Sequence, residues 1–304
     1  MRALTINVFA HHGNWPARRE ALHAGLSVLR PDVVTLQEAI VEDGYDQAVE
    51  LLGPHYAVVH QQRGLAGDGR HHGASVASRW PIVATHEVDL HLTERTWDYS
   101  CGAVIAEVDA PVGRLLVACH GNSWAWWAER ERELQALALL RRIEELVAAE
   151  PAHVVIGGDF NATPDTASMR LFTGRQSLDG FSTAYRDCWA SVHGDGQGST
   201  VDPVNPLRAG VESGLTFEPG NPLSAVDEPG LDRGRRIDYL LVRCGDHGPT
   251  LRVTGCRLAL HEPVDGVHPS DHYGVLADLE PATDPAGPHA GLPGVSGGGG
   301  TVGR

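Results

Sequence analysis

Short apolar runs alternate with turn-rich polar stretches along most of the chain. Ten of these runs are brief and rich in β-branched residues, which is typical of strands buried on at least one face. Two longer segments, residues 16–29 and 125–149, are predicted helices; the second has apolar residues at helical spacing and Arg and Glu on its other side. The predicted strands are residues 4–9, 33–36, 56–59, 74–77, 103–108, 115–119, 154–156, 239–242, 253–260 and 273–279.

About ten strands are too many for a simple doubly wound sheet. The predicted elements therefore favour two packed sheets with helices on the outside. We find no internal repeat and no linker long enough to separate two cores. One domain over residues 1–280 is therefore expected. From residue 281 onward the chain is rich in Gly and Pro and lacks large side chains, which predicts a disordered tail over residues 281–304.

Polar residues of a few types gather where the apolar runs begin or end. Strand ends are where open sheets place ligand sites, because rigid strands and variable loops aim side chains at one point. If some strands run antiparallel, residues at strand starts reach the same rim. The residues concerned are Glu38, His120, Asp159 and Asn161 at strand ends, and Asp238, Ser270, Asp271 and His272 at strand starts.

Each of these residues also has an ordinary explanation. Glu38 could be a strand-end carboxylate, residues 159–164 an Asp/Asn turn, and Asp238 one partner of a surface ion pair. Several such coincidences in one chain are less credible than one shared site. Carboxylates and amides with few His and no Cys suit Mg²⁺, Mn²⁺ or Ca²⁺ better than Zn²⁺.

Composition narrows the chemistry further. All 24 basic residues are Arg, so lysine nucleophiles, Schiff bases and P-loop lysines are excluded. The 39 acidic residues give a formal charge of −15, which repels polyanions unless bound cations reverse the local sign. Five widely spaced cysteines without a CxxC pair argue against a disulfide framework or a Cys-based zinc site.

The distribution of apolar residues also bears on localisation. The N-terminal residues read as a strand rather than a signal peptide, and no apolar stretch approaches the roughly 18 residues that span a membrane. The expectation is a soluble, cytoplasmic protein in a reducing compartment, and a monomer.

Taken in order, the polar motifs resemble the endonuclease/exonuclease/phosphatase superfamily of metal-dependent phosphoesterases. The resemblance covers nearly the whole predicted domain and implies an α/β four-layer sandwich, with two packed mixed sheets flanked by helices and the site at one rim. The motifs are Asn7, LQE with Glu38, GASVASRWPI over residues 73–82, ACHGN with His120, GGDFNATP with Asp159 and Asn161, RIDYLLV with Asp238, and PSDHYGV with Asp271 and His272.

The resemblance implies a metal site and a substrate contact. It makes Glu38 the principal ligand of Mg²⁺, or alternatively Mn²⁺, with Asn7 and Asp271 as direct or water-mediated partners. Asn122 is implied as a further phosphate contact.

It also implies a catalytic role for five residues. His272 would lie beside the scissile phosphate and be oriented by Asp238, as a buried carboxylate fixes an imidazole tautomer. Asp159 would position or deprotonate the attacking water, and Asn161 would donate to phosphoryl oxygens. His120 would contact the phosphate or assist the leaving group.

The substrate is less well determined. Three arginine clusters fall in the predicted helices beside Glu residues: Arg18 with Arg19, Arg130 with Arg132, and Arg141 with Arg142. Most of these arginines are expected to lie on solvated faces or in i,i+4 pairs, so duplex nucleic acid is disfavoured. The expected function is a Mg²⁺-dependent phosphodiesterase acting on a small-molecule, lipid or nucleotide-type ester by in-line attack of water. A DNA or RNA nuclease is the alternative, and a catalytically silent binding module is a third.

Three tryptophans, Trp124, Trp126 and Trp127, follow the His120 motif closely. They either pack the start of the second helix or form an aromatic rim that stacks a base or touches a lipid. Residues 214–236 form a long predicted loop, and its GLTF…RRIDY pattern is similar to sphingomyelinase-like and small-substrate members of the superfamily.

Overall fold

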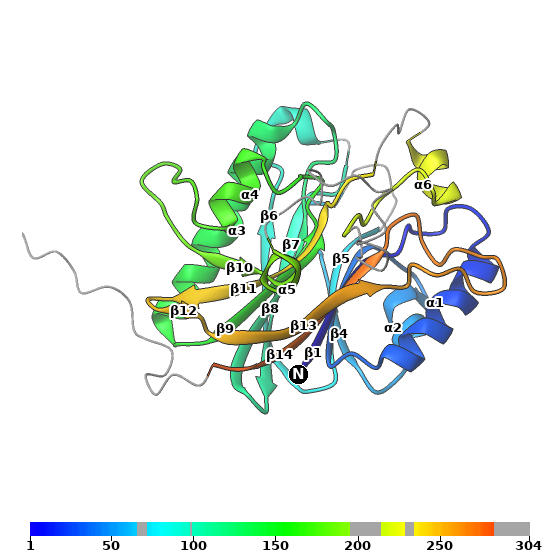
Figure 1. Cartoon of the computed structure of the whole chain (residues 1–304), viewed down its shortest axis with the longest axis horizontal. Helices are drawn as coiled ribbons and strands as arrows, with labels where there is room; N and C mark the ends of the chain where they lie inside the picture. The colour runs from blue at the N-terminus through cyan, green and yellow to red at the C-terminus, as the bar shows by residue number, and fades with distance from the viewer. Residues whose placement is uncertain (66–71, 98, 195–213, 229–233, 283–304) are drawn as a thin grey trace, which may run out of the picture.

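Two seven-stranded sheets pack face to face, with helices on their outer faces (Figure 1). The computed structural model describes residues 1–65, 72–97, 99–194, 214–228 and 234–282. The first sheet has the order β13-β14-β1-β2-β5-β4, with β3 paired to β2. Its strands are β1 (Arg2–Asn7), β2 (Val33–Glu42), β3 (Tyr45–Asp46), β4 (Ala57–His60), β5 (His72–Ser78), β13 (Leu251–Ala259) and β14 (Gly274–Pro281).

The second sheet has the order β10-β11-β9-β8-β7-β6, with β12 paired to β11. Both sheets are mixed, because β1 runs parallel to β2 and β8 parallel to β9 while the other pairs are antiparallel. The strands are β6 (Ile82–Asp89), β7 (Gly102–Ala110), β8 (Gly113–Gly121), β9 (His153–Asp159), β10 (Tyr185–Asp187), β11 (Asp238–Gly245) and β12 (Gly248–Pro249).

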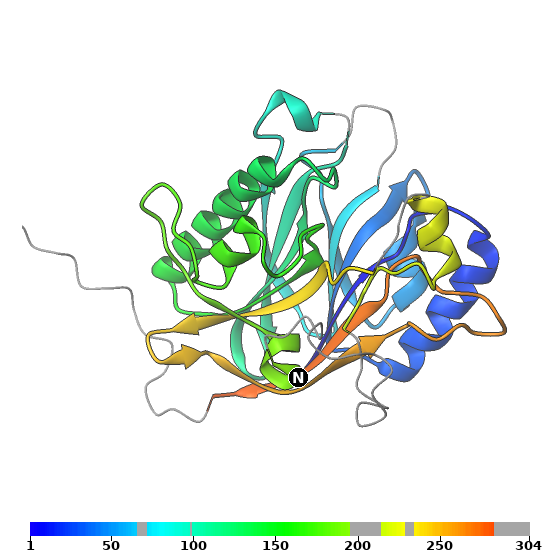
Figure 2. The same ribbon diagram turned by 45° about the horizontal axis from the view of Figure 1, so that its top comes forward.

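The helices cover the outer faces of the two sheets, as Figure 2 shows from a second direction. Helices α1 (Trp15–Leu29) and α2 (Gln47–Leu52) lie on the first sheet, and α3 (Glu129–Ala149) and α4 (Ala167–Phe172) on the second. Three further short helices are α5 (Cys188–His193), α6 (Pro222–Asp227) and the 3-10 turn η1 (Glu94–Thr96).

Strand alternation divides the core into three layers. Along β9, Val155 faces the opposite sheet, whereas Val154 and Ile156 pack under α3. The sheets approach so closely that a Cβ atom at Gly157 would lie 2.2 Å from Thr35 Oγ1. The first glycine of the GGD motif is therefore required by the packing of the two sheets.

The predicted sandwich of two packed mixed sheets flanked by helices is confirmed, and each of the ten predicted strands overlaps an observed one. Strand β6 was not predicted, because its burial alternates and Val83 is 65% exposed. The second helix begins at Glu129 rather than at residue 125, so the three tryptophans lie in the loop before it.

Three other expectations concern the ends and the cysteines. Strand β14 extends to Pro281, and residues 283–304 of the predicted tail lie outside the described residues. None of the five cysteines, all within the described ranges, forms a disulfide, and four of them are buried. No helix among the described residues is long and apolar enough to cross a membrane. The extent of the catalytic domain, residues 1–280, stays a prediction.

Candidate active site

Three predicted site residues lie at one rim of the sandwich because of strand alternation. Asn7 ends β1, Asp159 ends β9, and Asp238 begins β11 directly opposite Asp159 in the antiparallel ladder. Each lies an even number of residues from those of its strand that face the other sheet, so all three point into the space between the sheets. All are at least nine-tenths buried.

Glu38 reaches the same space through a break in its strand. Regular alternation would place it with Leu36 on the face beneath α1 and α2. The register of β2 against β5 shifts between Leu36 and Ala39, and Glu38 adopts a φ of 59°, in the left-handed region. A bulge of this kind redirects a side chain next to a functional site. It brings Glu38 Oε1 to 3.0 Å from Asn7 Nδ2.

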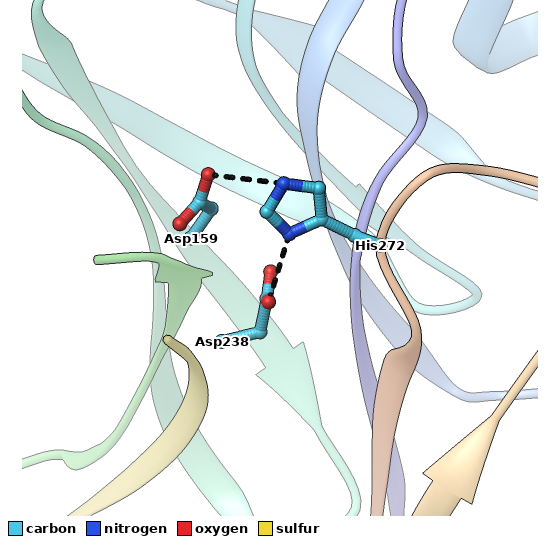
Figure 3. A group of neighbouring side chains, drawn as sticks. All are labelled: Asp159, Asp238 and His272. Atoms are coloured by element: carbon cyan, nitrogen blue, oxygen red, sulfur yellow. Dashed lines mark hydrogen bonds and ion pairs between the residues drawn. The ribbon is translucent and has the colours of Figure 1, made fainter. Parts of the chain in front are cut away.

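His272 lies between two carboxylates, as Figure 3 shows. Its Nδ1 is 2.9 Å from Asp238 Oδ2, and its Nε2 is 3.7 Å from Asp159 Oδ2. The hydrogen bond between Nδ1 and Asp238 fixes the orientation of the ring. The ring lines the pocket, and Nε2 is turned toward Asp159. Burial lowers the pKa of His272, but the charges of Asp238, Asp159 and Asp271 outweigh this and raise it well above its usual value.

Asp159 is held by two asparagines. Its Oδ1 accepts from the backbone N–H of Asn161 at 2.9 Å, and its Oδ2 accepts from Asn161 Nδ2 at 3.2 Å and Asn7 Nδ2 at 3.3 Å. Asn161 itself has a φ of 48°, which asparagine tolerates better than most residues. Burial is the main reason that the pKa of Asp159 is raised to about 7.

Asp271 precedes His272 and is 2% exposed. Ser270 Oγ lies 3.0 Å from Asp271 Oδ1 and donates to the Asn7 carbonyl at 2.7 Å, which ties this loop to the end of β1. Burial, opposed by the charge of His272 and assisted by that of Glu38, raises the pKa of Asp271 to about 7. Asn221 fixes the loop from outside by donating to the carbonyl oxygens of Ser270 and Asp271.

The segment that begins at Gly214 supports the pair formed by Asp238 and His272. The Thr216 hydroxyl accepts from the backbone N–H groups of Ile237 and Asp238, at 3.0 and 3.1 Å. The Phe217 ring packs against His272 with 4.8 Å between ring centres. The sequence pattern placed this segment beside Asp238, but it did not identify Thr216 or Phe217 as supports.

Arg18 is a support that the sequence analysis assigned wrongly to a solvated face. It is 1% exposed, because its guanidinium donates to five backbone carbonyls that belong to the loop after β1 and to Pro269. Burial lowers the pKa of Arg18 to about 10, partly offset by Asp271 and Glu38. The prediction fails because helical spacing alone does not show that the loop after β1 folds over Arg18, where Pro269 from a distant loop joins it. Arg132, 4% exposed, is a second arginine that is not on a solvated face.

Of the predicted site residues, Glu38, Asp159, Asn161 and His272 line a pocket of about 390 Å³. Tyr99, which was not predicted, donates to Glu38 Oε1 at 3.3 Å; burial and the charge of Glu38 raise its pKa, so the hydroxyl keeps its proton. The described residues that line the pocket are Phe9, His12, Glu38, His72, Tyr99, Trp124, Asp159, Asn161, Phe217, Asp227, Glu228, Arg235, Ile237 and His272.

His120 differs from its expected place. It follows Leu116 and Ala118 on the face of β8 beneath α3 and α4, the opposite face from Asp159. Its ring packs against Phe160 and Phe172, it is fully buried, and neither ring nitrogen has a hydrogen-bond partner among the described residues. Burial lowers the pKa of His120 to about 3.

Asn122 also has a structural contact in place of the expected phosphate contact. It is 3% exposed, and its Nδ2 donates to the carbonyl of Phe160 at 2.6 Å. This bond joins the loop after β8 to the loop after β9. Neither Asn122 nor His120 is among the described residues that line the pocket.

The donor set fits a hard divalent cation. Glu38, Asp159 and Asp271 bring carboxylates together, and burial raises the pKa of the two aspartates toward neutrality, which a bound cation would reverse. Asp159, Asp238 and His272 have potential ligand atoms within 4.8 Å of one another. In that trio, however, His272 Nδ1 and Asp238 are already hydrogen-bonded.

Comparison with solved structures shows the same fold in proteins of low sequence identity. D. rerio TDP2 complexed with single strand DNA product has a TM-score of 0.67 and 20% identity, over 92% of this chain and 98% of that chain. The human Nocturnin catalytic domain with bound sulfate anion has a TM-score of 0.65 and 18% identity, over 93% and 94%. An endonuclease/exonuclease/phosphatase from Bacteroides vulgatus also has 0.65 and 18%, over 92% and 98%.

No curated protein matches the sequence. The model of the Endonuclease/Exonuclease/phosphatase family, by contrast, matches residues 4–272. That range begins in β1 and ends at His272, and it includes every residue of the candidate site and every strand except β14. On this match, the chain belongs to the endonuclease/exonuclease/phosphatase family.

Proposed function

We propose that this protein is a Mg²⁺-dependent phosphodiesterase that hydrolyses a small phosphodiester by in-line attack of water. The observation that carries the proposal is the position of His272, with Asp238 on one ring nitrogen and Asp159 near the other. Membership in a family of phosphoric ester hydrolases supports it.

Glu38 and Asp271 are the residues that would hold the metal, with Asn7 beside Glu38. Their oxygen donors suit Mg²⁺, and Mn²⁺ as an alternative. When bound, the metal supplies positive charge to the phosphoryl oxygens.

The remaining chemistry belongs to side chains of this chain. The raised pKa of His272 keeps Nε2 protonated, so it can donate to a phosphoryl oxygen while Asp238 holds Nδ1–H. Asp159 lines the pocket and its Oδ2 lies 3.7 Å from His272 Nε2, so this carboxylate is placed to accept the proton of the attacking water. The water oxygen bonds to phosphorus as the bond to the leaving alkoxide breaks. Asn161 Nδ2 lies close enough to orient the same carboxylate or the phosphate.

The pocket supports a small substrate. Its described lining includes four carboxylates, of Glu38, Asp159, Asp227 and Glu228, and one arginine, Arg235. A duplex would need a basic surface that follows the groove. Single-stranded nucleic acid is a second candidate, because the D. rerio TDP2 structure of the same fold contains a single strand DNA product.

Hydrolysis of bis-p-nitrophenyl phosphate with Mg²⁺ or Mn²⁺ tests the proposal. We expect turnover that EDTA abolishes and added metal restores, and a loss of at least about 10²-fold in His272→Ala. Glu262→Gln, on an exposed loop, is the control and should behave as wild type. Metal-independent turnover, or full activity of His272→Ala, would contradict the mechanism. Plasmid nicking, sphingomyelin cleavage and phosphate release from monoesters then rank the substrate classes.

A further inference from the structure

The loop between β8 and α3 exposes three tryptophans beside the pocket. Trp124, Trp126 and Trp127 are 52%, 62% and 58% exposed. Aromatic side chains of this size bury a large apolar area when they find a partner, so three exposed rings in four residues indicate a contact surface.

Two of the three rings already have a cation on one face. Arg235 lies over Trp126 at 4.2 Å from the ring centre, and Arg95 lies over Trp127 at 4.1 Å. Trp126 Nε1 also donates to Glu228 at 2.9 Å. In the described part of the chain, neither a guanidinium nor another ring covers Trp124, and Trp124 is the tryptophan that lines the pocket.

The loop is held rigidly from below. Arg132, buried in α3, donates to the carbonyl oxygens of Ser123 and Ala125 at 3.2 and 2.8 Å. Gln135 Oε1 accepts from the backbone N–H of Ser123 at 3.0 Å. Trp124, between these anchored residues, is therefore presented on a fixed backbone, which lowers the entropy cost of binding a ligand.

A series of stacked groups connects the tryptophan loop to His272. Arg235 lies over Trp126 and, at 5.4 Å, over the Phe217 ring, and Phe217 packs on His272. Arg235 is the arginine of the described pocket lining, paired with Glu228 at 2.7 Å. The pocket volume of about 390 Å³ is in the range of small-ligand sites. The exposed ring of Trp124 and the guanidinium of Arg235 thus share a cavity with Glu38, Asp159 and His272.

The charges around the rings favour a planar base over a bilayer. Membrane-binding surfaces combine apolar side chains with Lys and Arg that attract anionic lipids. Here Asp227 and Glu228 lie at the rim, and the protein has a formal charge of −15. Stacking of a base on an aromatic ring needs no basic surface.

We propose that Trp124 is the stacking platform for the planar base of a nucleotide-type phosphodiester, with Arg235 facing the phosphate side of the same ligand. This rests on the proposed function, because the base would be part of the ester that the site hydrolyses.

Two esters with the same leaving group test it. Thymidine 5′-(p-nitrophenyl) phosphate carries a base, methyl p-nitrophenyl phosphate does not, and both release p-nitrophenolate. We expect kcat/KM to favour the thymidine ester by about tenfold or more in wild type. Trp124→Ala should remove about tenfold of this ratio, and Trp124→Phe should keep most of it. Trp127→Ala is the matched control from the same loop and should keep the full ratio.

Calorimetric binding of thymidine 5′-monophosphate and methyl phosphate, with Mg²⁺ present, gives a readout without turnover. We expect the nucleotide to bind about tenfold more tightly, and Trp124→Ala to lose that difference. Equal binding of the two ligands, or a tryptophan-dependent affinity for phosphatidylcholine vesicles without base discrimination, overturns the subsite. If neither ester is hydrolysed but Trp124 still discriminates the ligands, the proposed function fails and the subsite stands.

Discussion

Asp159 and Asp238 lie opposite each other on β9 and β11, and both side chains face the space between the sheets. His272, from the loop before β14, enters between them, 2.9 Å from one carboxylate and 3.7 Å from the other. Two like charges in a buried space repel each other, and the protonated imidazole relieves this repulsion. The ladder register therefore fixes both the position and the charge state of His272.

Removing the Asp238 charge should lower the pKa of His272 and slow the reaction. Asp238 is the strongest of the three charges that raise this pKa against burial. Asp238→Asn should reduce kcat by about 10²- to 10⁴-fold. The active form is protonated, so the alkaline limb of the pH–kcat profile should move to lower pH. Asp265→Asn, on an exposed turn, is the control; an unmoved limb in Asp238→Asn would contradict the assigned role.

Glu38→Gln should weaken metal binding more than it weakens the fold. The substitution keeps the bulge and the size of the side chain but removes the anionic oxygens. We expect a higher Mg²⁺ concentration for half-maximal activity and a loss of about 10³-fold at low Mg²⁺, since a catalytic metal contributes several kcal/mol to the transition state. Mg²⁺ titrations of rate and of heat, together with a thermal melt, measure this. Unchanged Mg²⁺ dependence would place the metal elsewhere.

Most of the sandwich could be predicted because many of its strands, such as β1, β7 and β8, are buried on both faces and therefore appear as apolar runs. β6 could not, since its exposed face hides it from that criterion. Asp159, Asp238 and His272 could be predicted as neighbours from their places at strand ends. The direction of Glu38 could not, because a bulge with a positive φ overrides the alternation of β2.

Arg18 shows a different limit. Its place in a helix beside Arg19 and Glu20 is typical of a solvated face, and Arg19 does form such an ion pair. Four of the five carbonyls that bind Arg18 belong to residues 8–12, in the loop before the helix, and the tertiary fold adds that of Pro269. The spacing of residues along the helix does not show how this loop folds, so it does not reveal the burial of Arg18.

Arg18→Lys should destabilise the protein although it preserves the charge. An ammonium group has three donors and lacks the planar fork, so at least two of the five carbonyls would lose their partner. With about 1–3 kcal/mol for each unsatisfied buried group, we expect the free energy of unfolding in urea to fall by roughly 2–6 kcal/mol. Mg²⁺ affinity should fall too, because the loops that carry Asn7 and Asp271 are the ones clamped.

Arg19→Lys is the matched control for that experiment. It changes the adjacent residue in the same way, but Arg19 lies on the exposed side of α1 and pairs with Glu20 and Glu50. Its unfolding midpoint and Mg²⁺ affinity should match wild type. Equal effects of the two substitutions would show that the clamp contributes nothing specific.

His120 could have been placed from the sequence by its alternation. It stands at the same parity as Leu116 and Ala118, which belong to the face under α3, whereas the prediction used only its position at the strand end. The resemblance to the family carried the role of a phosphate contact onto a residue whose ring lies among Phe160 and Phe172.

The burial of His120 should make stability depend on pH in a specific window. Its folded pKa is lowered to about 3, while the unfolded chain titrates near pH 6.5. Folding therefore favours the neutral imidazole. The folded protein has its full stability above pH 6.5, and its free energy of unfolding falls as the pH falls toward 3, by up to about 1.4 kcal/mol per pH unit.

His120→Leu should remove this pH-dependent loss, so the difference in unfolding free energy between variant and wild type should grow in favour of the variant from pH 7 to pH 4.5. At pH 7 the variant should be at least as stable, because no buried ring nitrogen is left without a partner. Urea unfolding at each pH measures both effects, and parallel pH profiles would mean that the imidazole of His120 is solvated or paired in the folded protein.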